Sequence, residues 1–91
     1  MDQSALERDV ALVQRAPVLA ACRDGPVGHS TIAERADCSR TTAYRATADL
    51  EDRGVLERTD GGYRLTNLGV TVLGHVERFR ATLDGARHLR P

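Results

Sequence analysis

Residues 39–53 carry the side chains whose types and spacing are best suited to binding chemistry. Ser39 is a typical helix cap, and the stretch after it predicts a helix over 40–53. An inward stripe with i, i+3, i+4 and i+7 spacing runs along this helix, formed by Ala43, Ala46, Thr47 and Leu50. The opposite face carries two arginines, two hydroxyl groups and no acid: Arg40, Thr41, Tyr44, Arg45 and Ala48. Because the acids follow only at the C-terminal end, the arginines coincide with the positive end of the helix dipole, which favours a polyanionic ligand.

Catalytic and metal chemistry are not expected. The three histidines (His29, His75 and His88) share no ligand spacing with each other or with the cysteines, so no metal site is predicted. The chain contains no lysine and no glycine-rich phosphate loop, and no Ser/His/Asp or Cys/His arrangement follows from the spacing. We therefore predict that the chain is not an enzyme, needs no cofactor and has no evident small-molecule ligand.

Cys22 and Cys38 are the two cysteines of the chain. Two thiols are too few for a disulfide framework and fit a reducing compartment. Burial as small hydrophobic side chains is the favoured interpretation. Redox sensing through Cys38 is one alternative, and a disulfide bond between the two cysteines is another.

The composition is that of one small domain. The 91 residues are 29% charged and 41% hydrophobic, which argues against disorder. Thirteen acids balance thirteen arginines, so the net charge of zero neither predicts nor excludes a nucleic-acid partner. No apolar run approaches the ~18 residues that span a bilayer. The N-terminus lacks the features of a signal peptide, and a cytoplasmic location is therefore expected.

Helical spacing predicts two helices before the binding stretch begins. Residues 1–16 form the first, which Pro17 interrupts, because proline suits only the first turn of a helix. The second runs from 17 to about 23. Its predicted inner face is formed by Val18, Leu19 and Cys22.

A third, short helix is predicted just before Ser39. Thr31 and Glu34 have the spacing of a capping box, which places this helix at about 32–36, after an extended segment over 27–29. Asp37 follows at a turn where the backbone favours a positive φ, which aspartate tolerates at some cost.

A hairpin is predicted after Gly54, which ends the binding helix as a C′ residue. Strands over 55–59 and 62–66 flank Asp60-Gly61, a dipeptide typical of a type I′ turn. In this register Leu56 faces Leu65, Arg58 faces Tyr63, and on the other side Glu57 faces Arg64.

The last predicted helix begins after Thr66, spans 67–84 and leaves a short basic tail over 85–91. One apolar strip along it comprises Leu68, Val72, Val76, Phe79 and Leu83. Val70 and Leu73 add a second strip. A single core needs one strip, so the surplus predicts a homodimer whose interface is the first strip.

The order of these elements is that of a winged helix-turn-helix, a mainly α fold with a small β-hairpin, here with an extra N-terminal helix and a C-terminal helix. Residues 31–45 (TIAERADCSRTTAYR), 50–56 (LEDRGVL) and 60–66 (DGGYRLT) resemble small prokaryotic winged-helix regulators. The likeness is closest to the DNA-binding domains of archaeal and MarR/ArsR/TrmB-like regulators. It divides the chain into an N-terminal helix (1–16), a winged helix-turn-helix core (17–66) and a dimerisation helix with its tail (67–91).

The resemblance implies a sequence-specific transcriptional regulator that binds double-stranded DNA as a homodimer. The recognition helix, 39–53, would enter the major groove, where arginine pairs with guanine, and the wing, 55–66, would lie on the backbone or minor groove. The DNA-binding residues expected on this basis are Ser39, Arg40, Thr41, Thr42, Tyr44, Arg45, Arg58 and Arg64.

Alternatives stay open at this point. The fold can serve as a protein-interaction or dimerisation module that ignores DNA, which the zero net charge favours. A cysteine-based redox regulator is the second alternative. At single positions, Tyr44 can lie against the wing, and Arg64 can simply pair with Glu57.

Overall fold

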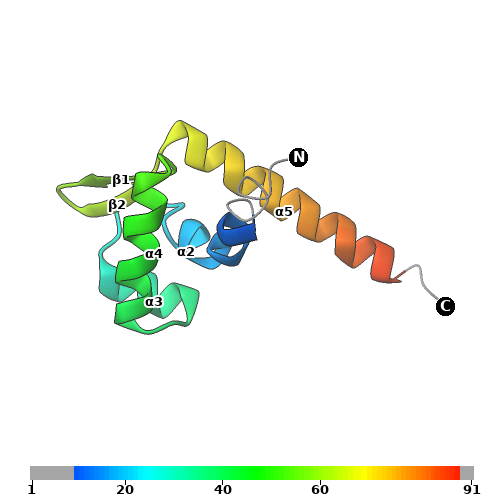
Figure 1. Cartoon of the computed structure of the whole chain (residues 1–91), viewed down its shortest axis with the longest axis horizontal. Coiled ribbons are helices and arrows are strands. Elements are labelled where there is room, and N and C mark those ends of the chain that lie inside the picture. Colours follow the sequence, from blue (N-terminus) through cyan, green and yellow to red (C-terminus); the bar gives the residue numbers. More distant parts are fainter. Residues whose placement is uncertain (1–9, 89–91) are drawn as a thin grey trace.

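The computed structural model describes residues 10–88. Residues 10–14 are helical, and the elements that follow are α2 (Ala16–Ala21), α3 (His29–Ala36), α4 (Arg40–Asp52), β1 (Leu56–Thr59), β2 (Gly62–Leu65) and α5 (Asn67–His88). α2 packs against α3, α4 and α5, and the hairpin projects to one side of α4 (Figure 1). The predicted fold class is confirmed. Of the predicted N-terminal helix, residues 1–9 lie outside the described part of the chain.

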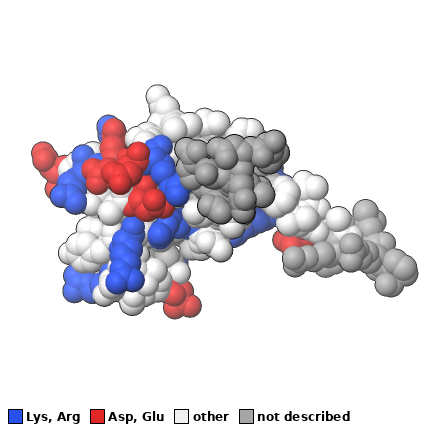
Figure 2. All heavy atoms as spheres, viewed as in Figure 1, with Lys and Arg blue, Asp and Glu red and all other residues white. Residues whose placement is uncertain are grey.

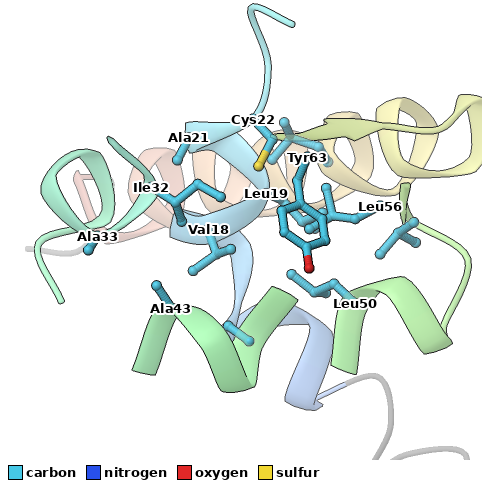
Figure 3. Close-up of a cluster of buried hydrophobic side chains, with 13 residues drawn as sticks. Val18, Leu19, Ala21, Cys22, Ile32, Ala33, Ala43, Leu50, Leu56 and Tyr63 are labelled. Atoms are coloured by element: carbon cyan, nitrogen blue, oxygen red, sulfur yellow. The ribbon is translucent and has the colours of Figure 1, made fainter. Parts of the chain in front are cut away.

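A single core joins the helices to the hairpin (Figure 3). Leu19 of α2, Ile32 of α3 and Leu50 of α4 are fully buried. Leu56 and Tyr63 bring the two strands into the same cluster. The hairpin is therefore fixed to the helices by apolar packing, which is what positions a wing beside α4.

Pro17 sets the start of α2. The helix begins at Ala16 with the proline in its first turn, where the missing N–H costs nothing. It ends at Ala21, slightly before the predicted end, and Gly25 then turns the chain with a φ of 111°. The predicted inner face is confirmed, because Val18, Leu19 and Cys22 are all buried.

The start of α3 corrects the prediction. The helix begins at His29 instead of about Ile32, its N-cap is Gly28, and no side chain caps it, so the capping box of Thr31 and Glu34 does not form. The reason is a contact distant in sequence: Val27 exchanges two backbone hydrogen bonds with Tyr63, of 2.9 and 2.8 Å. The extended segment stops there, and the helix starts directly after it.

α4 has the predicted cap and the predicted stripe. The Ser39 hydroxyl oxygen accepts a 3.0 Å hydrogen bond from the Thr42 amide, which satisfies an orphan donor of the first turn. All four residues of the stripe, Ala43, Ala46, Thr47 and Leu50, are buried. The turn before the helix contains Asp37 in the left-handed conformation (φ 54°), and Gly54 follows it with a φ of 77°. Both positive angles agree with the sequence prediction.

The hairpin has the predicted register but not the predicted turn. Leu56 pairs with Leu65, Glu57 with Arg64, and Arg58 with Tyr63. A type I′ turn needs positive φ at both central residues, whereas neither Asp60 nor Gly61 has one. The positive φ, 124°, falls at Gly62, where a Cβ would lie 2.3 Å from the Val27 carbonyl oxygen. The close approach of the segment before α3 explains why glycine stands there.

α5 is longer than predicted and is capped as predicted. The Thr66 hydroxyl oxygen accepts a 3.0 Å hydrogen bond from the Gly69 amide. The helix runs on to His88 through Gly85, because a glycine in a helix costs only about 1 kcal/mol and does not have to end it. The segment predicted as a short basic tail, 85–91, is therefore helical as far as His88.

Candidate nucleic-acid interface

The outer face of α4 is open to solvent. Of the sequence-predicted binding residues, Ser39, Arg40, Thr41, Thr42, Tyr44 and Arg45 are all exposed. The nearest acid on the helix, Asp49, is engaged by Arg15 (2.9 Å) and Arg53 (3.0 Å). In the view of Figure 2, acidic groups gather around the end of α4 that joins the hairpin. The N-terminal half of the helix is therefore the electropositive half.

Arg40 and Arg45 differ in how they are held. An Arg40 Nη donates a 2.7 Å hydrogen bond to the Ser30 hydroxyl, which links the start of α4 to α3 across the turn. Within residues 10–88, Arg45 makes neither a hydrogen bond nor an ion pair. One guanidinium of the face is thus pre-positioned, and the other is free to reach a ligand.

Tyr44 is fixed from behind by a histidine. Its ring stacks on that of His29, with centroids 3.8 Å apart and planes 18° apart, while 56% of the residue stays exposed. His29 in turn lies edge-on to Tyr63 of β2, at 5.1 Å. Tyr44 therefore rests on His29 of α3, and its outer surface remains available.

Arg58 completes this cluster from β1. Its Nη2 donates a 2.5 Å hydrogen bond to the Tyr63 hydroxyl, and its guanidinium carbon lies 5.2 Å from the centre of the Tyr63 ring. The cluster lines a cleft between α4 and the hairpin. Of the two predicted wing arginines, Arg58 is thus the one on the α4 side.

Arg64 projects from the other face of the hairpin. Neighbouring strand positions alternate sides, so residues 57 and 64 point away from residues 58 and 63. Arg64 Nε donates a 2.5 Å hydrogen bond to Glu57 Oε1, and both side chains are about half exposed. The cross-strand pair predicted as an alternative is therefore present, and the structure does not bring Arg64 together with the α4 face.

His29 is the residue of this region that the sequence did not reveal. The Thr47 hydroxyl donates its hydrogen to the Tyr44 carbonyl oxygen (3.1 Å), so its oxygen is left to accept from His29 Nε2, 3.0 Å away. Burial lowers the pKa of His29, and the charges of Arg58 and Arg40 lower it further. The only signal in the sequence was a histidine at the end of a short segment predicted as extended.

The cysteines are free thiols in different environments. Cys22 is buried, and that burial raises the pKa of its thiol to about 11. Cys38 is half-buried and packs against the core cluster from the turn before α4. Within the described residues, no group of three or more histidine, cysteine or acidic side chains is placed to hold a metal ion.

The apolar strips of α5 divide differently from the prediction. Leu73, assigned to the second strip, is buried in the protomer's own core, and so is Val76 at 7% exposure. Val72 is half-buried against the core. The prediction that Val76 belongs to a dimer interface is therefore wrong, because its side chain is buried within the protomer. Leu68, Phe79 and Leu83 stay exposed along one side of the helix. No helix among residues 10–88 is long and apolar enough to span a membrane.

The comparisons with known proteins agree with this fold. Residues 3–88 match the family described as the HVO_A0261 N-terminal domain. Among solved structures, the chain is similar to a protein of Nostoc punctiforme described as an O-methyltransferase (24% identity, TM-score 0.58), covering 69% of this chain and 20% of that one. It is also similar to PigF, solved with SAH (26% identity, TM-score 0.57), covering 75% and 22% respectively. A comparison with curated proteins gives no significant match.

The helices α2–α4 and the hairpin beside α4 define a winged-helix domain. The chain belongs to the HVO_A0261 N-terminal domain family, whose match extends over nearly all of its length. It spans only about a fifth of the length of these two solved chains, so the likeness to them concerns the fold.

Proposed function

We propose that this domain binds double-stranded DNA as a homodimer and regulates transcription, with α4 as the recognition helix. One observation carries the proposal: the N-terminal half of α4 presents Arg40, Tyr44 and Arg45 on an exposed surface without an acid. The described part of the chain does not cover this surface.

The geometry of α4 suits entry into the major groove from its N-terminus. The Ser39 cap and the packed stripe hold the helix rigidly, and the helix dipole adds positive charge at the same end. Arg45 is free to pair with guanine, a contact worth about 1–3 kcal/mol of discrimination between bases. Arg40, held by Ser30, is better placed to meet a backbone phosphate.

Duplex binding measured against salt tests the proposal. Fluorescence anisotropy with a labelled random-sequence duplex should show affinity that falls steeply with salt, because each neutralised phosphate adds about −0.9 to the log–log slope. We expect Arg40→Ala to make the slope shallower by about one, and Arg45→Ala to weaken binding to a selected site. Arg78→Ala, on the exposed surface of α5, is the matched control. Undetectable binding at low salt would contradict the proposal.

A protein-interaction or dimerisation module is the second candidate, and two observations favour it. Leu68, Phe79 and Leu83 leave an apolar side of α5 exposed. The fold also occurs as about a fifth of a longer chain described as an O-methyltransferase and of PigF, which fits a module that serves a larger protein better than it fits a DNA-binding domain.

Sedimentation equilibrium separates dimerisation from DNA binding. We expect Phe79→Ser to weaken self-association. The matched control is Val70→Ser, because Val70 is equally exposed (59% against 57%) and nine residues of helix place it on the opposite side. A wild-type chain that stays monomeric at tens of micromolar would remove the dimer. Self-association without any duplex binding would favour the second candidate.

A further inference from the structure

The cleft between α4 and the hairpin holds a titratable ring that is close enough to two arginines to interact with their charges. His29 lies at its base, stacked on Tyr44 and edge-on to Tyr63. The guanidiniums of Arg58 and Arg40 both act on the charge of His29. The remaining charged group of the cleft is Asp60, at the tip of the hairpin.

The hydrogen bonds around His29 determine which ring nitrogen is left to take up a proton and bind a ligand. Nε2 carries the hydrogen, because the Thr47 hydroxyl oxygen can only accept from it. Nδ1 of the neutral ring therefore has no hydrogen, and no partner for it exists within residues 10–88. Protonation would convert Nδ1 into a second donor without disturbing the bond to Thr47.

We propose that this cleft is a site for a backbone phosphodiester of bound DNA, and that His29 takes up one proton from solution when the phosphate arrives. Nδ1–H and Arg58 then donate to the phosphate oxygens, with Tyr44 as the stacked support of the ring. The inference deepens the proposed DNA-binding function and rests on it.

The charges explain why protonation and binding would be coupled. In the free domain the arginines disfavour a third positive charge, and the pKa of His29 is accordingly lowered. A phosphate between the same groups reverses the balance, because a nearby opposite charge favours the ionised form. By linkage, a proton that binds more tightly in the complex makes the DNA bind more tightly at lower pH.

The test is the pH dependence of duplex affinity at constant ionic strength, with the full chain. Between about pH 8 and pH 5.5, wild-type affinity should rise by roughly three- to tenfold per protomer, while the carboxylates stay mostly ionised. His29→Gln keeps an N–H donor for Thr47 but cannot be protonated, so it should lose this pH dependence. His75→Gln, an exposed histidine of α5, is the control and should behave as wild type.

Each outcome decides the inference. NMR titration of the His29 ring should give a higher pKa in the complex than in the free domain, a readout that a purely structural role of His29 would not move. Duplex binding that is independent of pH, or equally pH-dependent in His29→Gln, overturns this inference and leaves the proposed function intact. Absence of duplex binding at both pH values overturns both.

Discussion

Gly62→Ala is predicted to detach the wing from the helical core. Gly62 has a φ of 124°, and an added Cβ would lie 2.3 Å from the carbonyl oxygen of Val27 and 2.4 Å from its carbonyl carbon. Both are backbone atoms, which cannot turn aside as a side chain can. The strain can be relieved only if the segment before α3 moves away from β2.

The structure gives the size of the effect. An alanine at positive φ costs roughly 1–2 kcal/mol. Moving Val27 away breaks its two hydrogen bonds with Tyr63, of 2.8 and 2.9 Å, at about 0.5–1.5 kcal/mol each. The free energy of unfolding should therefore fall by about 2–5 kcal/mol, a large part of the stability of a domain of this size.

Urea denaturation followed by circular dichroism measures this loss. Gly74→Ala in α5 is the matched control, because nothing lies within 4 Å of its added Cβ and alanine favours the helix by up to about 1 kcal/mol. We expect opposite signs for the two substitutions. A Gly62→Ala protein as stable as wild type would refute the described packing of β2 against the segment before α3.

Three further predictions concern the thiols, the α5 cap and pH. At pH 7.5 a thiol reagent should modify the half-buried Cys38 and leave Cys22 unmodified until the protein unfolds, because burial raises the pKa of the Cys22 thiol to about 11; equal rates would contradict this. Thr66→Ala should lower the free energy of unfolding by about 1 kcal/mol in urea titrations, since the hydroxyl caps α5, and no change would refute the cap. The pKa of His29 is lower in the folded state, so the unfolded chain binds more protons and stability falls as the pH drops through the ordinary range of histidine. Thermal melts of His29→Gln should show a smaller loss between about pH 7.5 and pH 5.5, and an unchanged loss would argue against the described environment of the ring.

Patterns local in sequence predicted much of the fold. The stripe of α4 and the pairing of β1 with β2 follow from periods of 3.6 and 2, which depend only on neighbouring residues. The caps Ser39 and Thr66 are local for the same reason. For the candidate site, this was enough to place Arg40, Tyr44 and Arg45 on one exposed face.

Most of the errors have a different cause, because they depend on contacts distant in sequence. The pairing of Val27 with Tyr63 moves the start of α3 and transfers the positive φ to Gly62. Burial of Val76 depends on how α5 is rotated against α2, which periodicity does not determine. His29 joined the site only because α3 brings it beneath Tyr44.

Chemical-shift mapping with a duplex tests the central claim most directly. The claim is that the exposed arginine face of α4, together with the inner side of the wing, contacts DNA. On titration of a labelled domain with a short duplex, amide shifts should concentrate in residues 39–48 and 58–63, with little change in residues 70–80 of α5. An α4 face whose signals stay unchanged, or changes confined to α5, would contradict the claim.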